Sequence, residues 1–331
     1  MREIAFIKQN KEKWLDFEQA IFGKIKKNPD EMASLYIQIM NDLAYAQTYY
    51  PKSKTVLYIN YLASQIYQKI YKTKRTEQNR LVYFFKTEVP LLCYQYRYYI
   101  YFAFTTFMIT TFIGVVSAKY DPDFVRLILG DEYVNTTLEN IKKGNPVAIY
   151  KSGSNWGSFI GITINNLYVG MCCYIFGIFG GLGTFYYSLN NAIMLGSFQY
   201  FFVQQGVFIK SVRGIWIHGT MEIFAIVIET AAGYILGASI LFPQTYSRMN
   251  AFKIGLKNSI KILISTMPFT IAAGFLEGFI TRYALEMPMS LGFFIIISTL
   301  FIITYYYLIY PIIINKQIHK KNVSTIQKTQ L

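Results

Sequence analysis

The 331-residue chain has few charged residues, few cysteines and few histidines. Only 15% of its residues are charged, whereas soluble globular domains carry about 25%. The three cysteines, Cys93, Cys172 and Cys173, have neither a disulfide-framework nor a zinc-ligand spacing, and no CxxC or HExxH motif occurs. These shortages argue against a soluble enzyme, a zinc domain of the usual kind and a small disulfide-stabilised scaffold.

Apolar residues are abundant instead, at 53% of the chain, with 18% aromatic residues. Several stretches of twenty or more residues contain few or no charges, which is long enough to cross the hydrocarbon core of a bilayer. We therefore predict an all-α fold, a polytopic helical membrane protein with about six transmembrane helices in a core of residues 96–314. The predicted spans are 99–118, 158–182, 185–206, 214–242, 258–282 and 290–314.

The region before the core, residues 1–95, is polar and rich in lysine. Apolar residues recur there at three- and four-residue steps, for example Trp14, Phe17 and Ile21, which is typical of amphipathic helices too polar to span a membrane. We expect a cytoplasmic or interfacial helical region. Its first residues lack the apolar core of a secretory signal, so we expect this terminus to be retained.

The net charge of +14 is distributed unevenly. Residues 119–157 hold equal numbers of acidic and basic side chains, whereas residues 243–257 and the tail, residues 315–331, hold basic ones only. Under the positive-inside rule both termini are then cytoplasmic, and residues 119–157 lie outside. The expected partners are the lipid bilayer and other membrane proteins or further copies of this chain, and we expect no binding to nucleic acid.

Glycines spaced by four residues occur three times: Gly153 with Gly157 and Gly161, Gly233 with Gly237, and Gly274 with Gly278. In lipid, small residues at this spacing let helices approach closely. We expect them to pack helices together within the core; a pore or a dimer interface is the alternative.

The 214–242 span contains ionisable residues, which are rare within membranes. At about 100° per residue, Glu222 lies about 40° and Glu229 about 20° around the helix from His218, so all three share one face. Glu277 lies within another predicted span. Neutral polar groups complete the predicted intramembrane cluster of His218, Glu222, Glu229, Glu277, Asn165, Asn166 and Asn190.

Three interpretations of this cluster remain open, because such groups must face protein, water or an ion. The first is a structural clasp of hydrogen-bonded, uncharged carboxyl groups between helices. The second is a pathway for protons or ions. The third is a site for a divalent metal ion with His218, Glu222 and Glu277 as ligands, in which the i, i+4 spacing of the first two favours coordination but the single imidazole disfavours zinc.

The polar residues also carry a resemblance. His218-Gly219-Thr220-Met221-Glu222, followed by Ala231-Ala232-Gly233 and Leu236-Gly237, resembles the HGxxE…AAG…LG signature of the stage II sporulation protein M family. Asn165-Asn166, Asn190-Asn191 and Leu276-Glu277-Gly278 resemble further motifs of that family over about residues 99–314. The resemblance implies a polytopic membrane protein of bacteria or archaea, and the sporulation member acts with partners in envelope remodelling.

From these observations we expect a membrane-embedded scaffold or assembly component of a bacterial cell-envelope complex, in the inner (cytoplasmic) membrane, with the His/Glu cluster organising its core. The alternative is a transporter or channel for protons, cations or a small solute that uses the same cluster. A metal-dependent intramembrane hydrolase ranks third, so an enzyme is the less favoured expectation. No cofactor is predicted beyond the divalent metal ion of the third interpretation.

Overall fold

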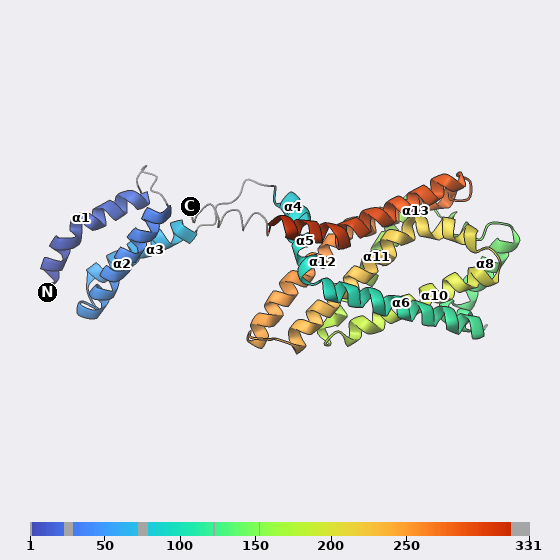
Figure 1. The fold of residues 1–331 in the computed structure, drawn as a ribbon, viewed down its shortest axis with the longest axis horizontal. Coiled ribbons are helices and arrows are strands. Elements are labelled where there is room, and N and C mark those ends of the chain that lie inside the picture. Colours follow the sequence, from blue (N-terminus) through green and yellow to red (C-terminus); the bar gives the residue numbers. More distant parts are fainter. Residues whose placement is uncertain (1, 23–28, 72–78, 122, 152, 319–331) are drawn as a thin grey trace. The chain divides into compact units, whose positions relative to one another are not determined.

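The structure, a computed structural model, describes residues 2–22, 29–71, 79–121, 123–151 and 153–318. It divides into two units, residues 1–78 and residues 79–331 (Figure 1). The described residues form helices and connecting turns with no strand, which confirms the all-α prediction. The basic tail beyond residue 318 lies outside the described residues.

The described residues of the first unit form three helices, α1 (Glu3–Phe22), α2 (Pro29–Tyr49) and α3 (Lys54–Tyr71). Their apolar faces meet in a core of their own, and the Trp14 Nε1 donates a hydrogen bond of 2.9 Å to Asp42 in α2. The buried residues of this core are Phe6, Trp14, Phe17, Ile39, Leu43, Ala46, Ile59, Leu62, Ala63 and Ile66. Each helix presents only one apolar face, so the three cover one another instead of crossing lipid.

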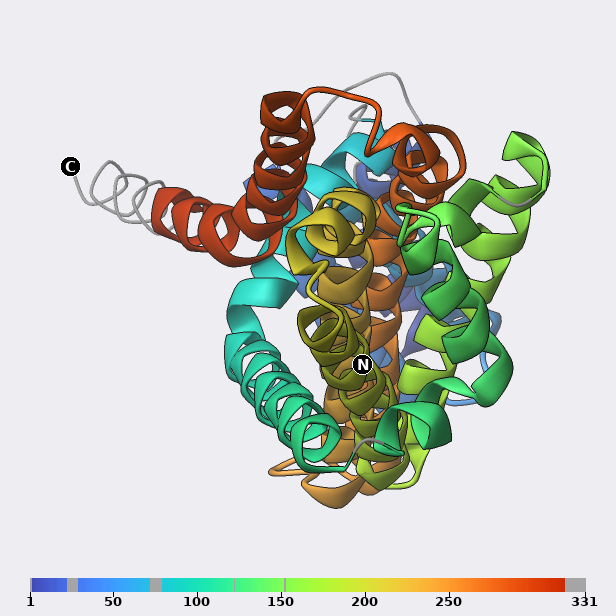
Figure 2. The same ribbon diagram turned by 90° about the vertical axis from the view of Figure 1, so that its right-hand side faces the viewer.

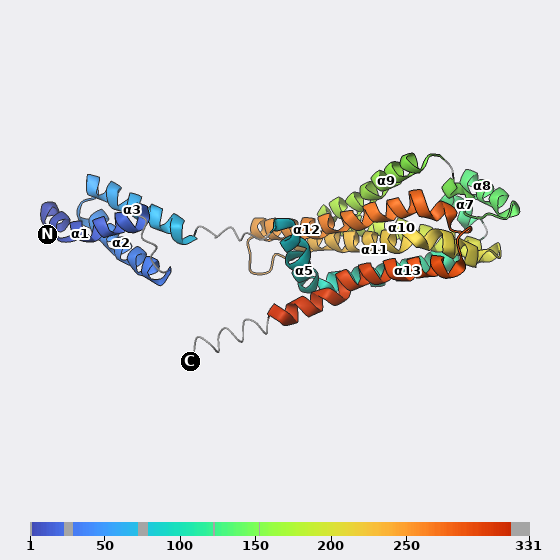
Figure 3. The ribbon, with the colours of Figure 1, turned by 90° about the horizontal axis from the view of Figure 1, so that it is seen from above.

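The second unit begins with α4 (Arg80–Tyr83), the π-helical segment η1 (Phe84–Glu88) and α5 (Val89–Gln95). After a bend at Tyr96 the remaining elements form the bundle, which Figure 3 shows running mainly along one direction. In order they are α6 (Arg97–Tyr120), α7 (Phe124–Leu129), α8 (Asp131–Lys142), η2 (Ala148–Lys151), α9 (Asn155–Ile175), η3 (Phe176–Ile178), α10 (Leu182–Gln204), α11 (Phe208–Leu241), α12 (Arg248–Phe275), η4 (Leu276–Ile280), η5 (Thr281–Tyr283), α13 (Met289–Thr304) and η6 (Tyr305–Ile309).

Five helical stretches among the described residues are long and apolar enough to cross a bilayer: 97–120, 155–178, 208–241, 248–283 and 289–318. The prediction of about six spans is therefore approximate. The predicted span without a counterpart among these five is 185–206, which corresponds to α10. This helix is 23 residues long, but it contains Asn190, Asn191 and Gln199 and is therefore less apolar than the other spans. The membrane-spanning class of the fold is nevertheless clear, because twenty apolar residues in a helix suffice to cross hydrocarbon.

Helix α11 lies at the centre of this bundle. In its most apolar stretch 72% of residues are buried, against 22–44% in the other four spans. It packs against α6, α9, α10, α12 and α13, and the end-on view of Figure 2 shows the other helices arranged around it. The surrounding helices expose apolar side chains such as Phe112, Ile164 and Phe294, as a lipid-facing surface requires.

Some of the predicted glycine contacts occur. A Cβ atom at Gly237 would lie 2.4 Å from the backbone nitrogen of Gly181, and one at Gly233 would lie 2.5 Å from the carbonyl oxygen of Cys173. At Gly274 it would lie 2.2 Å from the Thr163 Oγ1. These glycines bring α11 against the η3 turn and α12 against α9.

The prediction was wrong for the first glycine series. Gly153 lies in the turn before α9 with φ of +75°, so it is not part of a helix face. A Cβ atom at Gly161 would meet nothing within 4 Å, and one at Gly157 would meet only the Ser154 Oγ. Spacing alone cannot tell a glycine under a neighbouring helix from one beside an open space.

The predicted 243–257 loop is also shorter than expected. Only residues 242–247 connect α11 to α12, and Ser247 caps α12 by accepting a hydrogen bond from the backbone N–H of Asn250. Arg248, Lys253 and Lys257 therefore lie on the first turns of α12. These basic residues still lie at one end of the bundle, so the positive-inside rule gives the same orientation.

We predict that Gly237→Ala lowers the stability of the membrane unit by about 1–3 kcal/mol, because the added methyl group overlaps the η3 turn backbone. Gly161→Ala is the matched control and should be neutral or slightly stabilising, because alanine favours helices and has open space there. Thermal unfolding in detergent measures both. Equal midpoints for the two variants would contradict the packing argument.

Candidate functional site

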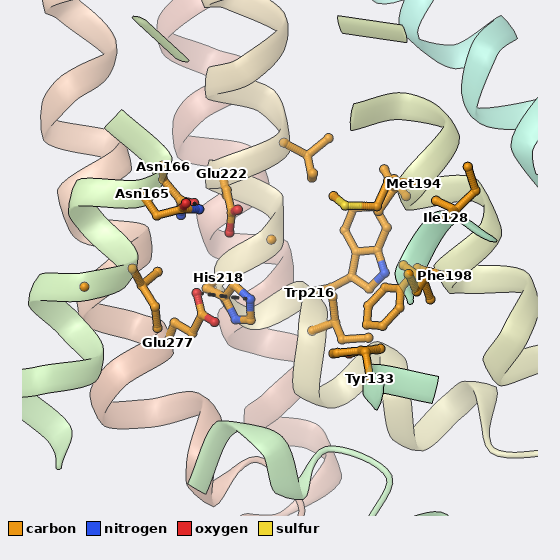
Figure 4. A pocket seen from close by; sticks show the side chains of 17 residues that line it. Ile128, Tyr133, Asn165, Asn166, Met194, Phe198, Trp216, His218, Glu222 and Glu277 are labelled. Carbon is orange, nitrogen blue, oxygen red and sulfur yellow. Dashed lines mark hydrogen bonds and ion pairs between the residues drawn. The ribbon is translucent and has the colours of Figure 1, made fainter. Parts of the chain in front are cut away.

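Three of the predicted residues converge inside the bundle. His218 and Glu222 lie one turn apart on α11, and Glu277 reaches them from η4 (Figure 4). One ligand atom from each residue lies within 4.8 Å of the other two. The His218 Nε2 is 3.6 Å from the Glu277 Oε2, and the His218 side chain is almost fully buried.

The local structure around Glu277 departs from a regular α-helix. Residues 276–280 form a π-helical segment, and residues 281–283 a 3₁₀ turn. The Thr281 Oγ1 lies 2.9 Å from the His218 Nδ1, so it holds the imidazole while Nε2 faces Glu277. π-Helical segments inside longer helices occur frequently at functional sites, because the wider turn is less stable than an α-helical one.

The cluster lies in the wall of a pocket of about 570 Å³ between α9, α10 and α11, with α7 and α8 contributing to its lining. Figure 4 shows its two contrasting sides. Asn165 and Asn166 join the three ionisable residues on one side. The opposite side is apolar and aromatic, and is formed by residues that include Ile128, Tyr133, Met194, Phe198 and Trp216.

Asn166 is 7% exposed, and its side-chain amide interacts with the Glu222 carboxylate without reaching the geometry of a normal hydrogen bond. The Asn165 Nδ2 donates to the Asn166 Oδ1 at 3.4 Å. A buried amide N–H group whose hydrogen bond is poorly formed is costly in a protein interior, and such groups commonly face a bound ligand or water. The polar side of the pocket thus has an amide donor beside its carboxylates.

Glu229 does not join the pocket. Its Oε1 accepts a hydrogen bond of 2.7 Å from the Thr266 Oγ1 of α12, and its carboxylate fills the space beside Gly170 of α9. It is 2% exposed and therefore faces neither lipid nor solvent. Glu229 is a separate contact between helices, about two turns further along α11 from Glu222.

Asn190 also lies apart from the cluster. It is exposed on α10 and does not line the pocket. Of the seven residues in the predicted cluster, the structure therefore brings five to one pocket. These are His218, Glu222, Glu277, Asn165 and Asn166.

Sequence reasoning missed Tyr133 and Trp216. Tyr133 comes from α8, in a segment whose balanced charge indicated only a polar loop, yet it lines the pocket. Burial, together with the nearby Glu277 carboxylate, raises the pKa of Tyr133 to about 12, so its hydroxyl stays protonated at neutral pH.

The Trp216 Nε1 donates to the Gln199 Oε1 at 3.2 Å, which fixes the indole ring. In the sequence, only the position of Trp216 two residues before His218 indicated that it lies near the site.

A second cavity, of about 420 Å³, adjoins the first. Tyr133, Gly161, Ile162 and Glu277 line both cavities, and Gly157 and Ser158 line the second. The glycines that do not pack against a helix thus border open space that reaches Glu277. This second cavity lies toward the beginning of α9, at the end of the bundle where residues 121–154 connect α6 to α9.

The donor set suits a divalent metal ion. One imidazole nitrogen and two carboxylate oxygens, held from one side, leave the pocket side open for further ligands, as in catalytic metal sites. The Thr281 hydroxyl on the other imidazole nitrogen is the kind of outer contact that orients a metal-binding histidine. The same groups could alternatively exchange protons with water in the pocket.

Fold and site together define a polytopic α-helical membrane protein with an imidazole–carboxylate cluster on a central helix. Residues 103–282 match the profile of the family described as stage II sporulation protein M. This match covers more than half of the chain, and the chain belongs to that family. Residues 4–72, in the first unit, match a domain of unknown function, DUF8413. Comparisons with curated proteins and with solved structures gave no match.

We predict that Glu229→Ala destabilises the bundle by about 1–2 kcal/mol, since it removes a hydrogen bond between helices and leaves a void beside Gly170. Its effect on ligand binding in the pocket should be small, because Glu229 lies outside the lining. Thermal unfolding in detergent reports the first effect, and calorimetric titration with a divalent metal reports the second. A Glu229→Ala protein as stable as the wild type would remove the structural role.

Proposed function

We propose that the membrane unit binds a divalent cation at His218, Glu222 and Glu277 and presents it to a small molecule in the adjoining pocket. One observation carries this proposal: the three ligand groups meet at the wall of a cavity of about 570 Å³. A cation occupies only a small part of such a volume, so there is room for water and a further ligand.

The geometry favours a binding site over a clasp alone. In a clasp the polar groups satisfy one another, as Glu229 and Thr266 do. Here Glu222 and Glu277 line an open pocket instead of being enclosed by hydroxyl donors. Two carboxylates this close repel each other unless a proton or a cation lies between them. A bound cation would satisfy both carboxylates at once.

The ligand set indicates which cations fit best. Mixed nitrogen and carboxylate ligation suits Mn²⁺ or Fe²⁺, and to a lesser extent Zn²⁺ because only one imidazole is present, better than Mg²⁺ or Ca²⁺, which prefer oxygen ligands only. A metal ion with an open side can act as a Lewis acid toward a substrate or activate a water molecule. Metal-dependent hydrolysis and passage of the cation itself are the two activities that follow from such a site.

We propose further that the protein lies in the bacterial inner membrane with both termini in the cytoplasm. Support comes from the basic residues at the start of α12, Arg248, Lys253 and Lys257, which mark the cytoplasmic end of the bundle under the positive-inside rule. The pocket lies toward the opposite end, where α7 and α8 contribute to its lining. In this orientation the cluster is reached from outside the cell.

Isothermal titration of the purified full-length protein with Zn²⁺ or Mn²⁺ tests the binding site. We expect one cation per chain, and we expect Glu222→Gln and Glu277→Gln to weaken binding at least about tenfold, because each removes one anionic ligand. Binding should also weaken as the pH falls, because protons compete for all three ligands. Glu229→Gln is the matched control, since it changes a buried carboxylate outside the pocket.

Stoichiometric binding that survives both ligand substitutions would place the metal elsewhere, and no binding of either cation would refute the proposal. Proteoliposomes loaded with a metal-sensitive dye then separate the two activities. Cation influx that Glu222→Gln abolishes indicates transport. Tight binding without influx indicates that the metal stays in the protein and acts on a pocket ligand.

A second candidate function is that of an assembly component of a cell-envelope complex. A different observation supports it. The first unit has its own closed core, and its helices are too polar to cross lipid. Within the bundle His218 links α11 to residues of η4 and η5, and Thr220 links α11 to Thr299 of α13 at 2.7 Å. A scaffold would use such links to hold its helices in a fixed arrangement.

This candidate predicts that His218→Ala lowers the unfolding temperature even in metal-free buffer, because contacts to Thr281 and Glu277 are lost. It also predicts reduced co-purification of envelope partners, or of a second tagged copy, and no cation flux. Thermal unfolding and tandem purification measure these effects. Unchanged stability together with unchanged co-purification would leave the scaffold role without support.

A further inference from the structure

The pocket beside the cluster is far larger than an ion and has sides of different chemistry. Polar groups from α9, α11 and η4 occupy one side (Figure 4). The other side consists of apolar and aromatic residues from α7, α8, α10 and α11, including Phe198, Met194 and Trp216. A small polar solute would leave this second side bare, and a purely apolar ligand would leave the carboxylates unsatisfied.

The surface of the protein next to the pocket is open on the side of α9. Gly161, Asn165 and Met194 line the pocket and are also exposed. A Cβ atom at Gly161 would meet nothing within 4 Å, so this position leaves the side of α9 bare of side-chain atoms. Ile164, one helical turn away, is 63% exposed and does not line the pocket. A molecule dissolved in the surrounding bilayer could therefore enter past Gly161.

The polar side also indicates which head group would bind. The described residues that line the pocket include no lysine or arginine, so the protein itself offers no cation to an anionic group. The open side of a metal bound to His218, Glu222 and Glu277 would supply that charge. The Nδ2 of Asn166, whose side chain is more than nine-tenths buried and lines the pocket beside Glu222, supplies an N–H donor. The metal ion and the Asn166 N–H group would therefore both bind oxygen atoms of a head group.

Resting on the proposed function, we infer that the pocket takes a membrane amphiphile whose head group, a carboxylate or phosphate, binds the metal and Asn166 through oxygen. Its apolar portion lies along Trp216, Phe198 and Met194, and it enters between α9 and α10 past Gly161. The ligand is thus a lipid-like acid drawn from the bilayer, and the glycines of α9 keep its entrance open instead of packing helices together.

Trp216 provides the readout, because bromine quenches tryptophan fluorescence at short range. Zn²⁺-loaded full-length protein in nanodiscs is titrated with dibromostearate, with the corresponding dibrominated alkyl phosphate and with the dibrominated alkyl amine. The experiment uses a Trp156→Phe background, because Trp156 on α9 is 64% exposed and would itself be quenched by probe in the bilayer. We expect saturable quenching by one or both acids, absent when Trp216→Phe is added and weakened at least about tenfold when Zn²⁺ is removed. Comparing the two acids identifies the head group.

Gly161→Leu is the decisive variant, because its side chain extends into space that is open in the wild type. It should weaken quenching at least about tenfold without changing Zn²⁺ affinity. Ile164→Phe adds bulk to the lipid-facing side of the same helix and should leave quenching unchanged.

Three results would overturn the inference: equal quenching by the amine, quenching that does not depend on Zn²⁺, or quenching that Gly161→Leu leaves intact. Normal Zn²⁺ titration with no specific quenching by any probe would also overturn it, while leaving the proposed metal site standing. Loss of Zn²⁺ binding itself would instead refute the proposed function. The two failures are therefore distinguishable.

Discussion

The cost of placing ionisable side chains within hydrocarbon governs the arrangement of this bundle. A charged residue at the bilayer centre costs at least about 2.5–3.5 kcal/mol unless protein, water or an ion receives it. Helix α11 carries three such residues and is the most deeply buried span. The helices around it supply the threonines that meet them, Thr281 for His218 and Thr266 for Glu229. The central position of α11 thus follows from its polar residues as much as from its apolar ones.

The glycines divide according to the same requirement. Where α11 meets the η3 turn, Gly233 and Gly237 allow backbone contact, and dispersion forces between close helices replace the hydrophobic effect that is absent in lipid. Where α9 passes Glu277, Gly157 and Gly161 leave space beside a carboxylate. The membrane unit is therefore tightly packed at one end of α11 and open at the other, and the ionisable cluster lies at the open end.

Much of this could be predicted from the sequence, because helical periodicity fixes direction on a helix. It placed His218 and Glu222 on one face, and the mid-span position of Glu277 made it a candidate neighbour. The same periodicity put Glu229 on that face, but 11 residues of rise carry it about 16 Å away, to a different neighbour. The predictions for Asn190 and for the first glycine series were wrong for a related reason. A residue's angle on its own helix does not reveal which helix, if any, packs against it, and Tyr133 entered the pocket from a connecting segment without any periodic signal.

The contrast between Glu229 and Glu277 shows how one bundle can hold carboxylates for different purposes. Glu229 has a hydroxyl donor, a glycine-lined recess and almost no exposure, so all of its surroundings serve to hold it in place. Glu277 lies on a π-helical segment between two cavities, and its carboxylate contacts an imidazole that is itself held from behind by Thr281. A less stable helical turn and two adjoining cavities both reduce stability, and a purely structural carboxylate needs neither. A π-helical turn and two cavities meet at Glu277, which is expected of a ligand site. A ligand that binds there stabilises the folded protein and so offsets the stability that these features cost.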